Sequence, residues 1–289
     1  RALQADGERV QLRPPGFAAF LIFNPASGEF FGDGGDNRLT GGRGSDTLIG
    51  GGGNDTASYA DHNVAVNANL TTGIATATQT DGTEDRDELI GINNLIGGSK
   101  NDTLTGNENS NVISGGTGND TIVGLGGDDT LRGGAGKDSI DAGDGNDLVF
   151  GGGGSDPAGN VISSNPLLGP TPQPTVDDDD TISGGAGNDT IQGNAGNDSI
   201  DAGAGNDSVQ GNAGNDTIDA GTGDDTVDGG VGNDSLAAGD GNDLLSGGAG
   251  RDTLDGGAGN DTLMGGTGND TLRGGTGRDT VSYIDNTSA

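Results

Sequence analysis

A nine-residue repeat dominates the chain and limits what it can fold into. From Gly184 to Ser282, eleven consecutive units follow one another without a slip, each reading small-small-x-Gly-x-Asp-x-U-x, where U is Ile, Val or Leu. The first unit is Gly184–Gln192 and the last is Gly274–Ser282. A fixed short period indicates a solenoid, in which each repeat is one structural unit that packs only against its neighbours.

Each unit divides into a strand and a turn. The x-U-x triplet, such as Thr190-Ile191-Gln192, sets one apolar side chain between two polar ones, so strand alternation points U inward. The Gly-rich hexad predicts a turn, because glycine tolerates positive φ and close backbone approach. Two three-residue strands and two turns then form an eighteen-residue coil, and units n and n + 2 stack about 4.8 Å apart. The predicted fold class is all-β, a parallel β-roll (β-solenoid).

Stacking places the invariant Asp of every second unit in a column. Asp189 then lies near Asp207 on one edge of the roll, and Asp198 lies near Asp216 on the other. Two carboxylates about 5 Å apart repel by about 0.8 kcal/mol even in water, and one aliphatic residue per nine is a small source of compensation. Divalent cations bound between turns resolve the conflict. Calcium is favoured over magnesium, because a loop rich in backbone carbonyls suits the larger ion.

The unit resembles the repeat of the RTX (hemolysin-type) family of secreted calcium-binding nonapeptide proteins. The resemblance implies a β-roll with Ca²⁺ ions between turns, export as an unfolded chain by a type I secretion machinery, and folding in extracellular calcium. It thus implies an extracellular or cell-surface location. The Asp at the sixth position of each unit is the predicted metal ligand: Asp46, Asp55, Asp102, Asp120, Asp129, Asp138, Asp147, Asp156, Asp180, Asp189, Asp198, Asp207, Asp216, Asp225, Asp234, Asp243, Asp252, Asp261, Asp270 and Asp279.

Composition excludes several classes of protein. A net charge of −33 with 28% hydrophobic residues is typical of disordered chains, so we expect the protein to need its ions in order to fold. The acidity argues against nucleic acid and anionic membranes as partners. The absence of Cys excludes disulfides and thiolate metal sites. No apolar run approaches 18 residues, so we predict no membrane-spanning segment.

The segments outside the regular block have their own interpretations. Residues 1–31 are apolar in part and are interpreted as an N-terminal cap or the end of a preceding domain, with an assembly or ligand surface as the alternative. Residues 32–58 form a short repeat block. Residues 59–96 break the period and are interpreted as an insert that makes a wider coil of the same solenoid, with a separate binding loop as the alternative.

The second repeat block covers 97–156 and is followed by an interruption. Residues 157–180 are Pro-rich and acidic, which predicts an extruded loop after which either Asp156 or Asp180 serves as the ligand. Its acidic end, 177–180, is either a solvated run or an extra ion site. The regular roll covers 181–282. The end, 283–289, echoes the start of the 59–96 insert, so we expect it to open a further, truncated segment of a longer protein.

Three irregular units predict weaker ion sites. Asn replaces the ligand Asp at Asn37 in Gly32–Thr40 and at Asn111 in Gly106–Ser114, and Lys100 replaces the usual Gly. The only histidine, His62, lies in the insert and is interpreted as a solvated loop residue without a catalytic role. We therefore predict no catalytic residues, no cofactor besides calcium, and no enzymatic activity.

Three functions fit these features. The favoured one is a structural or adhesive scaffold in a surface-layer or adhesin-type protein, with other copies or cell-surface glycans as possible partners. The alternative is the export and folding module of a secreted enzyme or toxin whose catalytic part lies elsewhere. An ice-binding solenoid is less favoured, because it needs a regular Thr face. On the face examined, the seventh positions include Leu244 among Ser and Thr, and the ninth positions vary from Gln192 to Met264.

Overall fold

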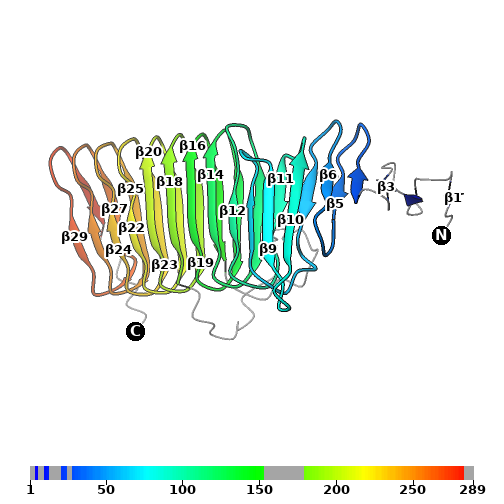
Figure 1. The fold of residues 1–289 in the computed structure, drawn as a ribbon. Helices are drawn as coiled ribbons and strands as arrows, with labels where there is room; N and C mark the ends of the chain where they lie inside the picture. The colour runs from blue at the N-terminus through cyan, green and yellow to red at the C-terminus, as the bar shows by residue number, and fades with distance from the viewer. Residues whose placement is uncertain (1–3, 6–9, 13–20, 25–27, 153–178, 283–289) are drawn as a thin grey trace.

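The computed structural model describes residues 4–5, 10–12, 21–24, 28–152 and 179–282, and these form an elongated solenoid of short strands (Figure 1). The strands belong to two sheets, one of 17 strands and one of 13. The described residues contain no α-helix, and hence none of them lies in a helix long and apolar enough to cross a membrane. This architecture confirms the predicted all-β fold, a parallel β-roll.

Sheet A contains the larger set of strands. In spatial order they are β1 (Gln4–Ala5), β2 (Val10–Leu12), β3 (Leu21–Asn24), β4 (Glu29–Phe31), β6 (Thr47–Ile49), β10 (Glu84–Ile90), β9 (Ile74–Thr78), β8 (Val66–Asn69), β12 (Thr103–Thr105), β14 (Thr121–Gly126), β16 (Ser139–Asp144), β18 (Thr181–Ala186), β20 (Ser199–Ala204), β22 (Thr217–Asp219), β24 (Ser235–Ala237), β26 (Thr253–Asp255) and β29 (Thr271–Arg273). From β12 onward every neighbouring pair is parallel.

Sheet B takes the alternate strands. They are β5 (Arg38–Leu39), β7 (Thr56–Ser58), β11 (Asn94–Ile96), β13 (Val112–Thr117), β15 (Thr130–Ala135), β17 (Leu148–Gly152), β19 (Thr190–Ala195), β21 (Ser208–Ala213), β23 (Thr226–Val231), β25 (Leu244–Gly250), β27 (Thr262–Met264) and β30 (Thr280–Ser282), with β28 (Thr267–Gly268) also beside β25. All these pairs are parallel.

The register follows the sequence period. Thr190 pairs with Ser208, and Ser199 pairs with Thr217, so each coil advances eighteen residues. The expected three-residue strands are too short for the middle of the roll. There the strands reach six residues, as in β18, because the first three residues of the next unit also pair with the neighbouring coil. The turn proper shrinks to about three residues per unit.

The core is a double column of aliphatic side chains. The U residue of every repeat unit from Leu104 to Leu263 is buried, and small residues such as Ala202 and Ala220 complete the interior. Val281 in the last strand is 40% exposed, because no described coil covers it. The two sheets therefore enclose a core only one side chain deep on each side.

Strands β8, β9 and β10 of the insert lie within sheet A and reverse the chain direction twice, while β11 lies in sheet B. β10 pairs parallel to β6, β9 pairs antiparallel to both β10 and β8, and β8 pairs parallel to β12. The coil expected at 59–96 is therefore built around an antiparallel three-stranded meander. Most of 1–31, the loop at 153–178 with Asp156, and 283–289 lie outside the described residues, so the roles expected for them stay predictions.

Candidate metal centre

The turns of the roll require glycine at two positions of the unit. In Gly184–Gln192, Gly185 and Gly187 have φ of 103° and 136°, values that favour glycine. A Cβ on Gly187 would lie 1.5 Å from the carbonyl oxygen of Gly145 in the neighbouring coil. The glycines thus let successive turns stack at backbone distance, which brings the Asp residues of the turns into line.

A ladder of hydrogen bonds joins the Asp residues along each edge. The backbone N–H of Asp189 donates to Oδ1 of Asp207 at 2.8 Å, and that of Asp198 donates to Oδ1 of Asp216 at 2.8 Å. The first column lies on the side of sheet A and contains Asp46, Asp87, Asp102, Asp120, Asp138, Asp180, Asp198, Asp216, Asp234, Asp252 and Asp270. Its ladder is interrupted between Asp87, which lies within β10, and Asp102, whose Oδ1 accepts the N–H of Val66. The second precedes the strands of sheet B and contains Asn37, Asp55, Asn93, Asn111, Asp129, Asp147, Asp189, Asp207, Asp225, Asp243, Asp261 and Asp279.

The second carboxylate oxygen of these residues is buried and lacks a hydrogen-bond donor. This holds for Oδ2 of Asp46, Asp55, Asp120, Asp129, Asp147, Asp189, Asp207, Asp216, Asp225, Asp234, Asp243, Asp252 and Asp261. A buried, unpartnered oxygen normally costs about 1–3 kcal/mol, and more when it is charged. A regular series of them therefore indicates that a ligand supplies the missing partner.

The space in front of Oδ2 lies beside a first-position glycine in units such as Gly211–Asp219, whereas Ala142, Ala202, Ala220 and Ala238 hold this position in four other units. A Cβ on Gly211 would lie 2.3 Å from Oδ2 of Asp216 and 2.8 Å from the carbonyl oxygen of Gly229, one coil further on. We call this space in front of Oδ2 the cradle. It presents an anionic oxygen and a backbone carbonyl, which are ligands of a hard cation. No three His, Asp or Glu side chains converge on one point in the described part of the chain, so an ion here needs backbone carbonyls in its shell.

Burial raises the pKa of the column carboxyls. The pKa of Asp120 rises to about 7 because the side chain is buried, an effect that the N–H of Asp102 opposes and the carboxylate of Asp138 increases. Burial likewise raises the pKa of Asp216 to about 7 and that of Asp189 to about 6. Without metal, the ionised carboxylates of the columns therefore destabilise the folded chain, and a bound cation would offset that destabilisation.

The predicted ligands differ in how the structure places them. Asp180 lies in the first column at the interrupted unit, where its Oδ1 accepts the N–H of Asp138 at 2.8 Å. Asp156 lies outside the described residues. Asp270 and Asp279 are half-buried at the C-terminal end of the roll. The remaining predicted ligands occupy the two columns, and their role in binding metal stays a prediction.

The Asn positions behave differently from the Asp positions. Oδ1 of Asn111 accepts the N–H of Asn107 at 2.8 Å, and its Nδ2 donates to the carbonyl oxygen of Asn93 at 2.7 Å. Oδ1 of Asn37 accepts the N–H of Asp33 at 2.7 Å. An amide at the sixth position is therefore satisfied within its own turn, which supports the expectation of weak ion sites there.

Two column positions were missed in the sequence. Asp87 lies in the first column, where its Oδ1 accepts the N–H of Asp46 at 2.9 Å, and Asn93 lies in the second, where its Oδ1 accepts the N–H of Asp55 at 3.0 Å. The signal for Asp87 was present, because Gly82–Ile90 has Gly, Asp and Leu at the first, sixth and eighth positions of a unit. The period was hidden by the meander that precedes it.

The interpretation of His62 as a solvated residue is wrong. The side chain is buried, its Nδ1 lies 3.1 Å from Oδ1 of Asp61, and its Nε2 lies 3.2 Å from Oδ2 of Asp85. Its ring packs edge-on against Tyr59 with 5.2 Å between the ring centres. The side chain of Asp85 is buried in β10. The hairpin of β9 and β10 brings Asp85 to His62.

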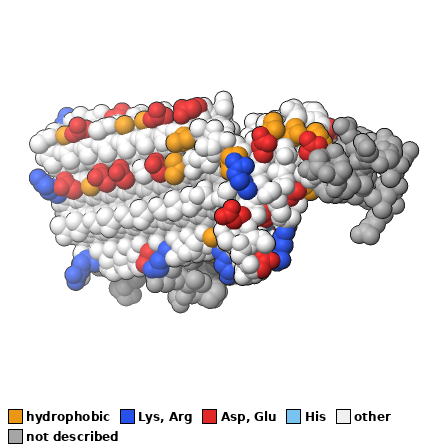
Figure 2. Space-filling model, in the orientation of Figure 1, with side chains coloured by type: hydrophobic (Ala, Val, Ile, Leu, Met, Phe, Trp, Pro, Cys, Tyr) orange, Lys and Arg blue, Asp and Glu red, His pale blue; other side chains and the backbone are white. Residues whose placement is uncertain are grey.

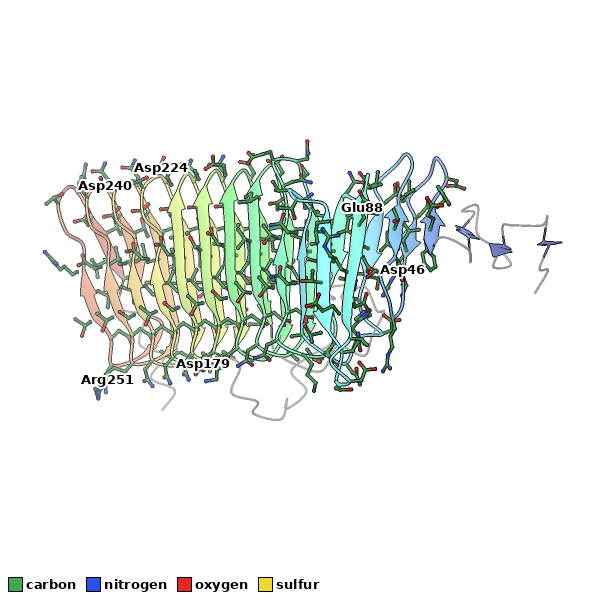
Figure 3. All side chains as sticks on the ribbon, viewed as in Figure 1. Asp46, Glu88, Asp179, Asp224, Asp240 and Arg251 are labelled. Atoms are coloured by element: carbon green, nitrogen blue, oxygen red, sulfur yellow. The ribbon has the colours of Figure 1, made fainter. Side chains whose placement is uncertain are left out.

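Side chains at the fifth position form a separate, exposed ladder outside the turns. Nδ2 of Asn233 donates to Oδ1 of Asn215 at 2.9 Å, and Nδ2 of Asn242 donates to Oδ1 of Asp224 at 3.0 Å. Figure 3 shows Asp224 at one edge of the roll, with Asp179 and Arg251 at the opposite edge. These ladders tie neighbouring turns together without closing the buried cradles.

Comparison with known proteins gives one family and 28 matching chains among solved structures. The family model for the RTX calcium-binding nonapeptide repeat matches residues 30–58, 82–122, 123–156, 175–209, 202–236, 228–263 and 256–282. The search of curated proteins found no match. A similar solved structure is the X-ray crystal structure of a hyperactive, Ca²⁺-dependent, β-helical antifreeze protein from an Antarctic bacterium. It is 19% identical, the match covers 87% of this chain and 81% of that chain, and the TM-score is 0.38.

Proposed function

Because the chain belongs to the RTX calcium-binding nonapeptide repeat family, we propose that it binds several calcium ions between the turns of its roll and works as an extracellular scaffold. The observation that carries the proposal is the double column of buried carboxylates, in many of which, such as Asp207 and Asp216, one oxygen accepts a backbone N–H and the other lacks a donor. Bound calcium would supply positive charge to that second oxygen. The column Asp residues, together with first-position carbonyls such as that of Gly229, would hold the ions.

Calcium binding would be coupled to folding. The chain carries a net charge of −33, and the core is a thin double column of aliphatic residues, so little else opposes the repulsion between carboxylates. Acidic side chains also lie in rows along the surface of the roll (Figure 2). Ions that bind only the folded chain stabilise it by mass action. Extracellular calcium modules typically have dissociation constants of about 10⁻⁴ to 10⁻³ M, which supports folding after export by a type I secretion machinery.

As a scaffold, the roll would act through its length and regularity. Its turns present the same side-chain positions at every coil, and such a surface suits repeated contacts with other copies or with cell-surface glycans in a surface-layer or adhesin-type protein. We propose no catalytic role for the described residues. The alternative is a folding and export module of a secreted enzyme or toxin, in which the same ions would stabilise a roll attached to a catalytic domain.

One observation favours ice binding as a second candidate. The seventh positions on sheet A form an unbroken, exposed ladder of hydroxyls: Thr103, Thr121, Ser139, Thr181, Ser199, Thr217, Ser235, Thr253 and Thr271. The irregular positions named above, Leu244 and Met264 among them, belong to sheet B. The ninth positions beside this ladder include Asp201, Asp219 and Asp255, and charged side chains make the face less regular. Thermal hysteresis of the calcium-loaded protein, measured against a Thr217→Asp variant, tests this candidate.

The calcium proposal is tested by far-UV circular dichroism of the full chain during titration with calcium, and then with magnesium. We expect a cooperative transition from coil to β-structure in calcium at micromolar to millimolar concentration, and none with magnesium over the same range. A β spectrum that is already complete in excess chelator would contradict the proposal, because the columns would then be stable without ions.

A further inference from the structure

The two Asp columns change character in the middle of the chain. At four positions in or beside the insert, Asp87, Asn93, Asp102 and Asn111, each side-chain oxygen in the column accepts a hydrogen bond from the protein itself. We define residues 59–111 as the insert segment. In the later coils, the second oxygen lacks such a donor in Asp120, Asp129, Asp147, Asp189, Asp207, Asp216, Asp225, Asp234, Asp243, Asp252 and Asp261. The insert segment and the later coils therefore differ in whether protein donors bond every side-chain oxygen at the sixth position of the unit.

In the first column, the donors are one hydroxyl and three backbone amides. Oδ1 of Asp87 accepts the N–H of Asp46, and its Oδ2 accepts the hydroxyl of Tyr59 at 3.1 Å. Oδ1 of Asp102 accepts the N–H of Val66 at 2.8 Å, and its Oδ2 accepts the N–H of Gly98. Both carboxylates are thus closed by protein donors in the place where the later coils leave an oxygen open.

In the second column, amides replace the carboxylates. Oδ1 of Asn93 accepts the N–H of Asp55, while Asn111 both accepts from Asn107 and donates to Asn93. An amide brings no charge that needs a cation. Four successive positions thus lack the open anionic oxygen that defines the candidate calcium cradle.

The insert segment contributes larger side chains and local pairing to the continuous core of the roll. Tyr59, Val66, Ala68, Leu89 and Leu95 are buried in that core. The antiparallel pairing of β8, β9 and β10 adds a meander held by contacts close in sequence. The meander thus has the three strands and apolar face that independent stability needs. Asp85 is the exception to the closure, because its Oδ1 has no donor while its Oδ2 faces His62 and Gln79.

We infer that the insert segment binds no calcium in its columns, keeps its fold without calcium, and divides the ion sites into two separate arrays. One array is short and contains Asp46 and Asp55; the other runs from Asp120 and Asp129 to the end of the roll. The inference rests on the proposed function, because it assigns positions to the ions proposed there. It makes the insert segment the preformed surface on which calcium-dependent coils assemble.

Hydrogen–deuterium exchange of the full chain, read by mass spectrometry with and without calcium, tests the inference directly. In chelator we expect protected amides in β8–β12 and rapid exchange from β14 onward, with calcium adding protection mainly from β14 onward. An insert segment that exchanges freely in chelator and becomes protected with calcium overturns the inference and leaves the proposed function standing. If calcium adds no protection anywhere, the proposed function fails.

Two variants test the closure of the columns. Tyr59→Phe keeps the ring and removes the hydroxyl that bonds Oδ2 of Asp87, so protection of the insert segment in chelator should fall about tenfold.

Asn111→Asp should add about one bound calcium, counted by equilibrium dialysis, because it restores the ligand type of the regular units. Asn109→Asp makes the same charge change on an exposed side chain two residues away and should add none. Equal calcium counts for Asn111→Asp and the wild type would overturn the assignment.

Discussion

In each regular turn, the two carboxylate oxygens of the sixth-position aspartate have different roles. Oδ1 accepts the N–H of the Asp one coil earlier and sets the distance between turns, while Oδ2 points into the cradle beside the first-position Gly or Ala. Asn can perform the first task, as Asn93 shows, but not the second. The difference between the two residue types is therefore one anionic oxygen, and this difference can be measured.

Asp216→Asn removes that oxygen from the middle of the first column. We expect about one fewer bound calcium, because the amide is a weaker ligand for a hard cation. The metal-free chain should become slightly more stable, because a buried carboxylate with a raised pKa is replaced by a neutral group. Isothermal titration calorimetry gives the calcium count. Asp219→Asn, on the exposed face of β22, is the matched control and should leave the count unchanged.

Gly211→Ala fills a cradle without changing charge. The new Cβ would meet Oδ2 of Asp216 at 2.3 Å, so that carboxylate must move aside; because Ala202 and Ala220 hold the same position in the adjoining units, the calcium-loaded roll should lose only about 1 kcal/mol of stability from overpacking. Gly34→Ala, where a Cβ meets nothing within 4 Å, is the control. Urea unfolding in calcium compares the two variants, and similar stabilities would show that the cradle is not needed.

At the scale of the element, each strand depends on its neighbours in both directions. A central strand such as β18 pairs along six residues with β16 and with β20, yet it contributes only one large aliphatic side chain, Ile182, to the core. Hydrogen bonds and ions between coils therefore take a larger share of the stability than in a globular domain. The aliphatic column is nevertheless continuous, and one gap in it should be costly.

Ile218→Ala should destabilise the calcium-loaded roll by about 2–5 kcal/mol, because Ile218 is 1% exposed and its loss leaves a cavity between β20 and β24. The measurement is chemical denaturation in saturating calcium, followed by circular dichroism. Val231→Ala, at a side chain 64% exposed in β23, should change the stability by less than about 0.5 kcal/mol. Equal effects would mean that the core contributes little.

For the whole molecule, charge decides when the roll forms. The chain has 45 acidic and 12 basic residues other than histidine, and it buries a large share of its carboxylates in two rows. Calcium and protons are alternative ways of neutralising those rows. The stability of the roll should therefore depend on pH in opposite directions with and without calcium.

The direction follows from the pKa shifts. Burial raises the pKa of Asp120 and Asp129 to about 7 and that of Asp189 and Asp225 to about 6 in the folded chain, above the ordinary value of 3.8, so the folded state binds more protons over that range. Without calcium, stability is greatest below the unfolded pKa and falls as the pH rises through 4 to 7. Calcium-depleted protein should show more β-structure by circular dichroism at pH 5 than at pH 8. In millimolar calcium the pH 8 sample should be the better folded one, and an opposite order without calcium would contradict the assigned shifts.

The sequence by itself determined the roll. The nine-residue period predicted the fold class, the eighteen-residue register, the aliphatic column and most of the Asp positions, because in a solenoid each contact repeats at a fixed offset along the chain. Asn111 was also recognised as a departure from the ligand pattern. These predictions needed only local periodicity, since units n and n + 2 meet in space whatever the rest of the chain does.

Only the tertiary structure determined the features that the nine-residue period does not predict. The six-residue strands arise from pairing between coils. Asp180 takes the ligand position because the chain returns to register after a 24-residue interruption, at 157–180, that no period could predict. Asp87, Tyr59 and His62 are brought together by the reversals of β8, β9 and β10. Antiparallel pairing joins residues at changing sequence separations, so their burial and their hydrogen bonds follow from the folded geometry and not from the repeat.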